Sequence, residues 1–253
     1  MTYSTEHFAS FDGARLAIHT EGEGRPVILL HGLFSSAQMN WIKWGHGARL
    51  AAAGFRAIML DFRVHGDSDA PQDAAAYPPG VLVRDVAALA EHLGLEPGGF
   101  DLVGFSLGAR TAIHTVAHGI LEPRRLAICG MGVAGLAEWE RRAGHFKRVI
   151  DEFDTIKPGD PAYAARTFLK SQSVDRVAAR LLLDAMDDFD LARLSGITMP
   201  TAVICGDEDQ DNGSAEDLAA LLPDARYIAV PGTHMNSVTK PELGIAIADF
   251  LAA

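Results

Sequence analysis

The chain has 253 residues, of which 48% are hydrophobic and 22% are charged, and its formal net charge is −11. This length is enough for one large hydrophobic core, and the composition is that of an ordinary globular protein. The acidic excess opposes binding to nucleic acid or to an anionic membrane, so we predict neither as a partner, and its simplest consequence is solubility.

Strand and helix signals alternate along the first half of the chain. Asp12-Gly13-Ala14 between residues 8–11 and 15–20 indicates a β-hairpin. Further strands are expected at 26–30, 56–60, 100–103 and 125–129, and helices at 44–53, at 81–93 and directly after Ser106. Such alternation is typical of an α/β fold with a mostly parallel sheet.

The segment from about residue 136 to residue 193 differs, because it has no clear strand and is rich in helix-forming and charged residues. Helices are expected there at 139–153, 161–171 and 174–186. The α/β pattern then resumes with strands at 201–205 and 226–230 and helices at 214–222 and 241–251. The predicted organisation is a core of residues 1–133 and 194–253 with an inserted helical cap of residues 134–193.

Two cysteines, Cys129 and Cys205, each end an apolar run and are expected to be buried as small hydrophobic side chains. They do not make a disulfide framework, which fits a reducing compartment. Residues 1–7 lack the basic start and apolar segment of a signal peptide, and no window approaches a membrane-spanning length. We therefore expect a cytoplasmic protein.

The pentapeptide Gly104-Phe105-Ser106-Leu107-Gly108 lies between an expected strand and an expected helix. Gly-x-Ser-x-Gly in that context is the signature of a nucleophile elbow, a tight turn that exposes the serine hydroxyl. Neighbouring backbone comes close at such a turn, so the flanking positions have to be small. Because glycine is abundant in this chain, the motif gains its meaning from its context and its partners.

A serine hydroxyl needs a base, and the base needs an acid that orients it. In this type of fold the chain order is serine, acid, histidine. Four acids follow the strand that ends at Cys205, namely Asp207, Glu208, Asp209 and Asp211. We select Asp209, three residues beyond the glycine at the strand end, and keep Asp207 as second choice. His234, in a glycine-containing loop after the last strand, is the predicted base.

Acyl transfer also needs backbone N–H groups that stabilise a negative oxygen. We expect one donor at Leu107, just after the nucleophile, and the other at Leu33 in the loop His31-Gly32-Leu33-Phe34. Gly32 is expected to let this loop turn, and His31 to orient it by hydrogen bonds.

The predicted substrate-binding residues are Phe34, Phe105, Met131 and Trp139, with Met39, Trp41 and Phe146 nearby. An aromatic and apolar lining of this kind favours an uncharged acyl or aryl group. Many of these side chains are equally suited to packing the core or the cap.

Five motifs in this order resemble the α/β-hydrolase superfamily, in its serine-nucleophile, esterase- and haloperoxidase-like branch with a helical cap. They are Leu30-His31-Gly32-Leu33, residues 61–68 (DFRVHGDS), Gly104-Phe105-Ser106-Leu107-Gly108, Gly206-Asp207-Glu208-Asp209 and Gly232-Thr233-His234. The resemblance covers nearly the whole chain and implies an eight-stranded, mostly parallel sheet with helices on both sides. It also implies a triad of Ser106, Asp209 and His234 and oxyanion donors at Leu33 and Leu107.

The chain departs from the family pattern in a few places. Val64 stands where the Asp-x-Arg-Gly-x-Gly-x-Ser loop usually has glycine, so the backbone near Arg63 is expected to differ, and Ala109 replaces a second glycine after the elbow. Serine at the nucleophile position is unlike the aspartate of haloalkane dehalogenases and epoxide hydrolases of this fold. No acid follows Cys129, which supports Asp209.

We predict a serine hydrolase that cleaves a small carboxylic ester through an acyl-enzyme, with no metal and no organic cofactor. A thioester, a lactone or an amide is the alternative substrate class. The same scaffold also supports cofactor-free perhydrolases and carbon–carbon bond hydrolases, and a ligand receptor without turnover is the third interpretation, since fold alone does not choose among them. The sequence indicates neither the natural substrate nor the oligomeric state.

Overall fold

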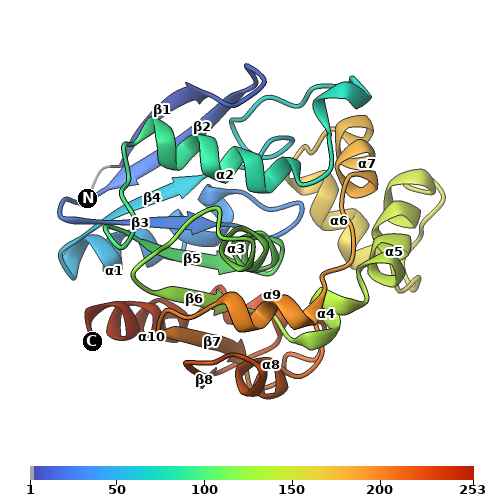
Figure 1. Ribbon diagram of the computed structural model, residues 1–253. Coiled ribbons are helices and arrows are strands. Elements are labelled where there is room, and N and C mark those ends of the chain that lie inside the picture. The colour runs from blue at the N-terminus through green and yellow to red at the C-terminus, as the bar shows by residue number, and fades with distance from the viewer. Residues whose placement is uncertain (1–2) are drawn as a thin grey trace.

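The computed structural model describes residues 3–253, which form an eight-stranded sheet with helices on both sides (Figure 1). The strands are β1 (Ser4–Ala9), β2 (Arg15–Glu21), β3 (Arg25–Leu30), β4 (Phe55–Leu60), β5 (Asp101–Phe105), β6 (Leu126–Cys129), β7 (Thr201–Gly206) and β8 (Ala225–Val230). Their order in the sheet is β1-β2-β4-β3-β5-β6-β7-β8. Because β2 is antiparallel to β1 and β4 while all other pairs are parallel, the predicted mostly parallel α/β fold is confirmed.

Helices cover both faces of this sheet. They are α1 (His46–Ala52), α2 (Val81–His92), α3 (Leu107–Ala117), α8 (Ala215–Leu221), α9 (His234–Ser237) and α10 (Pro241–Ala252), with short turns η1 (Gln38–Ile42) and η2 (Ala74–Ala76). Successive side chains of a strand point to opposite faces. In β3, Val27 and Leu29 therefore join the core under α1 and α10, whereas Ile28 and Leu30 join the core under α2 and α3. Burial on both faces explains why the central strands are apolar over most of their length.

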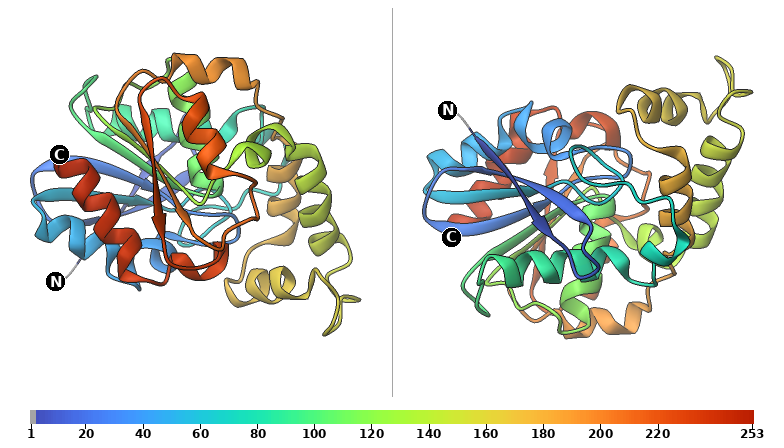
Figure 2. Two further views of the ribbon diagram at one scale, coloured as in Figure 1. Left: turned by 90° about the horizontal axis from the view of Figure 1, so that it is seen from below. Right: turned by 90° about the horizontal axis from the view of Figure 1, so that it is seen from above.

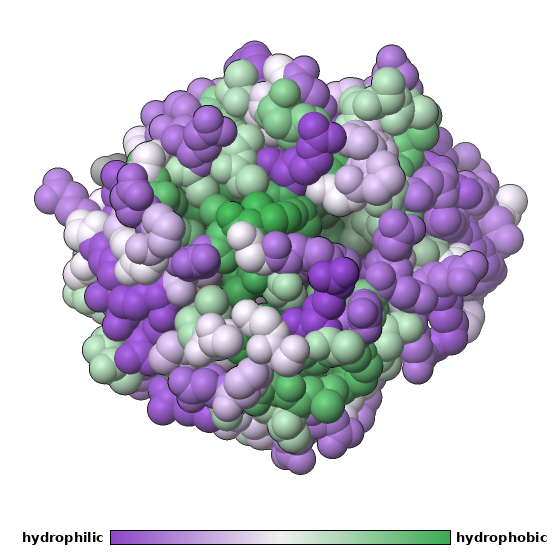
Figure 3. Space-filling view, in the orientation of Figure 1, coloured by the Kyte–Doolittle hydropathy of each residue, from purple (hydrophilic) through white to green (hydrophobic). Residues whose placement is uncertain are grey.

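A helical insert, residues 133–196, connects β6 to β7. It contains α4 (Val133–Ala137), α5 (Trp139–Asp151), α6 (Tyr163–Ser171), α7 (Arg176–Asp184) and the short turn η3 (Leu191–Gly196). The insert projects from one side of the core, opposite both termini (Figure 2). The three helices predicted there are confirmed, while the division into core and cap at residues 134–193 stays a prediction. Hydrophilic side chains cover the side of the molecule at the right of Figure 3. In the insert, Lys147 pairs with Asp184 and Arg148 pairs with Asp160.

The first strand differs from the sequence prediction. β1 spans Ser4–Ala9 rather than residues 8–11, and the hairpin turn begins at Ser10, whose N–H donates to Ala14 O at 2.8 Å. β1 lies at the edge of the sheet and buries only Phe8, so it carries no apolar pattern that could have marked its extent.

The parallel strands bring five loops to one edge of the sheet. The loop beginning at His31 follows β3, Ser106 follows β5, Met131 follows β6, and the loops holding Asp209 and His234 follow β7 and β8. Ligands of open α/β sheets bind outside the carboxyl ends of the strands, so this edge is the first place to look for a site. Within residues 3–253, no helix has both the length and the apolar character needed to cross a lipid bilayer.

Helix α3 packs against β3 at a distance that only glycine allows. A Cβ built on Gly108 would lie 2.1 Å from the carbonyl oxygen of Leu30. Gly144, in α5, has nothing within 4 Å of the same built atom. The two glycines are both helical, so they form a matched pair that separates steric fit from helix propensity.

We predict that Gly108→Ala lowers the free energy of unfolding by about 2–3 kcal/mol, because the methyl group forces α3 away from β3. Gly144→Ala should raise that free energy by up to about 1 kcal/mol, since alanine is the better helix former. Urea unfolding followed by circular dichroism measures both, and equal effects of the two substitutions would contradict the close packing of α3.

Candidate active site

Ser106 lies on a sharp turn between β5 and α3. Its φ is 53°, in the left-handed region that non-glycine residues rarely adopt, and its N–H donates to Cys129 O at 2.9 Å. A Cβ built on Gly104 would lie 2.3 Å from Gly108 O, so both glycines of the motif are required by the close backbone. The turn thus has the strained geometry expected of a nucleophile elbow.

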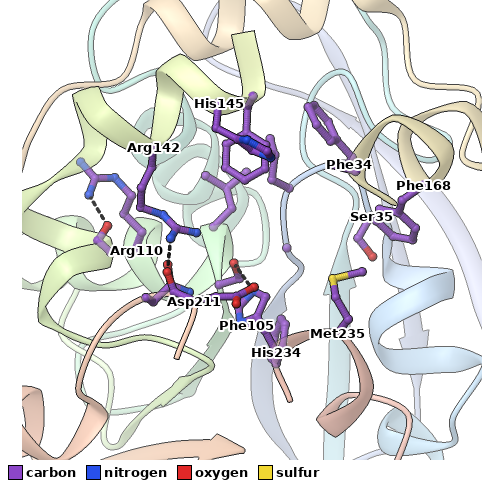
Figure 4. A pocket seen from close by; sticks show the side chains of 18 of the residues that line it. Phe34, Ser35, Phe105, Arg110, Arg142, His145, Phe168, Asp211, His234 and Met235 are labelled. Atoms are coloured by element: carbon purple, nitrogen blue, oxygen red, sulfur yellow. Dashed lines mark hydrogen bonds between the residues drawn. The ribbon is translucent and has the colours of Figure 1, made fainter. Parts of the chain in front are cut away.

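His234 connects Ser106 to Asp209 by hydrogen bonds (Figure 4). His234 Nδ1 lies 2.8 Å from Asp209 Oδ2, and His234 Nε2 lies 3.0 Å from Ser106 Oγ. A carboxylate only accepts, so Nδ1 carries the hydrogen and Nε2 is free to accept the serine proton. The structure therefore brings together the three residues that the sequence analysis selected, from three different loops.

Asp209 is held by more than the histidine. Its Oδ1 accepts the N–H of Asp211 at 3.0 Å, and the Sγ of Cys205 lies 3.4 Å from its Oδ2. Burial alone would raise the pKa of Asp209, but the hydrogen bond and charge of His234 outweigh burial and hold that pKa below its usual value. Asp207, the second choice, instead accepts the N–H of Gly232 at 2.7 Å and closes the turn after β8.

Two backbone N–H groups beside Ser106 have no acceptor within residues 3–253. They belong to Leu33 and Leu107, and both residues line the cavity above the serine. Backbone N–H groups in folded proteins are nearly always paired, so two free ones at one cavity wall are candidate donors to a bound ligand.

Three side chains fix the loop that carries Leu33. His31 accepts the N–H of Phe62 at Nε2 (3.1 Å), and its Nδ1 lies 2.7 Å from Gly32 O, as expected of a residue that orients the loop. His65 accepts the N–H of Phe34 at 3.1 Å, and Asn40 Oδ1 accepts the N–H of Gly32 at 3.0 Å. His65 and Asn40 were not identified from the sequence, because neither stands in a motif with the residue that it holds.

A profile described as the alpha/beta hydrolase family matches residues 27–243, most of the chain. The chain belongs to the alpha/beta hydrolase family. This hydrolase is 34% identical over 180 residues to N-formylmaleamate deformylase of Pseudomonas putida, a match covering 66% of this chain and 63% of the relative. Epoxide hydrolase 2 of Siraitia grosvenorii is 34% identical over 104 residues, 41% of this chain, and the match spans only 31% of that relative's length.

The fold is shared with solved structures along the full chain. A hydrolase from Pseudomonas aeruginosa PA01 superposes with a TM-score of 0.76 at 24% sequence identity, covering 99% of each chain. At that identity the similarity concerns the fold, so the substrate of this hydrolase has to be inferred from its own residues.

Three residues of this hydrolase other than glycine have positive φ around the site: Phe34 (57°), Val64 (79°) and Ser106 (53°). The loop after β3 has its positive φ at Phe34 and not at Gly32, and Gly32 begins the turn, because its carbonyl oxygen accepts the N–H of Ser35 at 3.2 Å. Val64 takes a conformation that suits glycine, although it is β-branched. Backbone strain of this kind is typical of functional sites.

An ion-pair network supports the loop around Val64. Buried Arg63 pairs with Asp85 at 2.6 Å and with Asp12 at 3.1 Å, and Ser10 Oγ donates to Asp85 at 2.5 Å. Asp61, at the start of the same loop, accepts the N–H of Ala37 at 2.7 Å. These contacts hold the strained backbone that carries His65.

A cavity of about 510 Å³ opens above Ser106. The predicted substrate-binding residues Phe34, Phe105, Met131 and Trp139 all line it, as does Phe146. Met39 is not among the lining residues, and Trp41 is fully buried in the core under α1 and α10, so their expected place at the mouth is wrong. The lining also contains charged side chains that the apolar prediction did not include: Arg110, Arg141, Arg142 and Asp211.

Within residues 3–253, two groups of acidic and histidine side chains are close enough to be considered as metal ligands. One is Asp209, Asp211 and His234, and the other is His19, Asp61 and Asp67. Asp209 and His234 bind each other, and Asp61 binds His19 at 3.0 Å and the N–H of Asp67 at 2.9 Å. Hydrogen bonds within the protein account for both groups.

We predict that His65 makes this hydrolase less stable in acid. Burial lowers the pKa of His65 to about 3 in the folded state, against about 6.5 in the unfolded chain. Between these values only the unfolded chain binds the proton, so stability is present above pH 6.5 and falls as the pH decreases toward 3.

His65→Gln removes that proton linkage while glutamine can still accept the Phe34 N–H. The slope of unfolding free energy against pH, measured by urea unfolding, should decrease by up to about 1.4 kcal/mol per pH unit below pH 6.5. Equal slopes in the two proteins would show that His65 is not held neutral.

Proposed function

We propose that this protein is a serine hydrolase that cleaves a small carboxylic ester through a covalent acyl-enzyme. The observation that carries the proposal is the Asp209–His234–Ser106 series of hydrogen bonds beside the two unpaired N–H groups of Leu33 and Leu107. Nucleophile, base, orienting acid and oxyanion donors are the four parts that acyl transfer requires.

In the first step Ser106 Oγ attacks the carbonyl carbon while His234 Nε2 accepts the serine proton. The low pKa of Asp209 keeps that carboxylate ionised, so it holds the Nδ1–H and stabilises the imidazolium that forms. The N–H groups of Leu33 and Leu107 donate to the negative oxygen of the intermediate. The C–O bond then breaks as His234 delivers the proton to the departing alcohol.

In the second step water hydrolyses the acyl-enzyme. His234 takes a proton from water, the resulting hydroxide attacks the acyl carbon, and Ser106 leaves with the proton that His234 returns. The cavity of about 510 Å³ is within the usual range for small-molecule sites, which supports a compact substrate.

The name of the relative from Pseudomonas putida favours a second candidate function, the hydrolysis of a bond between an acyl group and nitrogen. Its name, N-formylmaleamate deformylase, describes removal of a formyl group. The same four parts serve that reaction when His234 protonates a departing nitrogen. Epoxide opening, named for other relatives, is not proposed, because Ser106 stands where those enzymes of this fold use aspartate.

Burst kinetics with p-nitrophenyl acetate, butyrate and octanoate tests the nucleophile. We predict turnover by the wild type and a loss of at least about 10⁴-fold in Ser106→Ala, because only the serine can form the acyl-enzyme. Ser171→Ala, at an exposed serine of α6, is the matched control and should keep full activity.

Full activity in Ser106→Ala would contradict the nucleophile assignment. Inactivity of the wild type on all three esters would remove the ester proposal and leave the carbon–carbon hydrolase and receptor interpretations. A Ser106-dependent rate that rises with hydrogen peroxide, with formation of peracid, would favour the perhydrolase.

The acid is tested by a pair of neighbouring substitutions. We predict that Asp209→Asn lowers kcat by about 10³- to 10⁴-fold, because an amide no longer fixes the histidine tautomer. Asp207→Asn keeps an oxygen that can accept the Gly232 N–H, so its kcat should change less than about threefold. A larger loss in Asp207→Asn than in Asp209→Asn would reverse the assignment of the acid.

A further inference from the structure

The cavity above Ser106 is positively charged, in contrast to the chain as a whole. The protein carries a net charge of −11, but the ionised side chains that line this cavity are Arg110, Arg141, Arg142 and Asp211. Arg141 is 70% exposed and pairs with Glu138 at 2.7 Å, so its charge is balanced at the rim. Arg110 and Arg142 remain, with Asp211 as the acidic residue of this lining.

Arg142 has donors that the protein does not use. It lies on α5, one turn from Trp139 and His145, and these three residues face the cavity together. Its Nη1 donates to the carbonyl oxygen of Asp211, and within residues 3–253 no carboxylate oxygen lies within 4 Å of its guanidinium. Since a guanidinium carries five N–H donors, a planar acceptor can still bind.

Arg110 is a second arginine in the lining of the same cavity. Its Nη1 donates to Gly135 O and Leu136 O, both at 2.9 Å, and its Nη2 donates to Asp187 O. Its guanidinium lies 5.0 Å from the centre of the Trp139 ring. Carbonyl groups and an aromatic ring hold Arg110 in place, while the charges of Asp187 and Asp188 act on it from outside the cavity lining.

The charged and apolar parts of the cavity lie on opposite sides of the reacting serine. Figure 4 shows Arg110 and Arg142 on one side, Phe168 and Met235 on the other, and His234 between them. A substrate that spans the serine would meet cations with one arm and apolar side chains with the other.

We propose that the substrate carries one carboxylate, bound by Arg142 on the cationic side of the cavity, and a short apolar arm on the opposite side. This inference rests on the proposed function, because it places the scissile bond at Ser106. Arg142 is the specificity-determining residue, and Arg110 adds charge without contacting the ligand. The apolar lining expected from the sequence then describes only part of the cavity.

Arg142 also has a structural contact that the test must separate from recognition. The carbonyl of Asp211 accepts from Arg142, and the N–H of Asp211 donates to Asp209, so Arg142 is connected to the acid of the site. If that connection were its whole purpose, removing Arg142 would slow all substrates equally. Recognition of a carboxylate predicts a selective loss.

The test uses two pairs of esters in which a carboxylate is replaced by a carboxamide of the same shape. Monomethyl adipate and methyl 6-amino-6-oxohexanoate place the group on the acyl arm, and 4-acetoxybutanoate and 4-acetoxybutanamide place it on the alcohol arm. The measured quantity is the ratio of kcat/KM for the anionic and neutral member of each pair.

In at least one pair the wild type should favour the anion by roughly 10- to 100-fold, as expected for a hydrogen bond between charged groups. Arg142→Gln should abolish most of this ratio, and Arg142→Lys should retain part of it. Arg148→Gln, on the same helix but paired with Glu152 and Asp160 outside the cavity, should leave the ratio unchanged.

Equal rates for anion and amide in both pairs, or an equal loss for both in Arg142→Gln, would overturn the inference while the ester proposal stands. If no ester is hydrolysed, the proposed function fails, and calorimetry on Ser106→Ala decides the inference alone. Binding of 6-amino-6-oxohexanoate but not of adipamide, lost when Arg142→Gln is added, would support the carboxylate site, and equal binding of the two compounds would overturn it.

Discussion

The close approach of helix α3 to strand β3 is the constraint on which the site depends. Gly108 packs its backbone on the carbonyl of Leu30, with no room for a Cβ between them. Leu30 is followed at once by the loop that carries the N–H of Leu33, and Gly108 is preceded by Leu107 and Ser106. One backbone contact therefore sets how far the two N–H groups lie from each other and from the serine hydroxyl.

Around that contact, buried polar groups hold backbone that would otherwise relax. Phe34 and Val64 both have positive φ. His65 connects the two loops that carry them, because it accepts the N–H of Phe34 and donates to Arg63 O at 2.9 Å. Neutral histidines suit this task because each ring offers one donor and one acceptor. The stability of this region and its readiness to bind a negative oxygen thus come from the same hydrogen bonds.

Local sequence was sufficient for the parts of the site that stand in motifs. Ser106 could be predicted because its turn needs small neighbours, and Asp209 and His234 because each follows a strand end. The roles of His65 and Arg142 could not be predicted. His65 binds Phe34, which lies 31 positions away in the sequence, and the place of Arg142 in the cavity depends on which face of α5 meets the core. The spacing of Trp139, Arg142 and His145 was the available signal. Trp41 shows the reverse error, because an aromatic residue near a motif can equally well belong to the core.

The central claim is that the serine and the two backbone N–H groups form one preorganised site for acyl transfer. A crystal structure of the protein inhibited with a small alkyl fluorophosphonate tests it most directly. We predict a bond from Ser106 Oγ to phosphorus, with the phosphonyl oxygen at about 2.7–3.1 Å from both Leu33 N and Leu107 N. An adduct on another residue, or a phosphonyl oxygen that faces solvent while these N–H groups stay unpaired, would contradict the account.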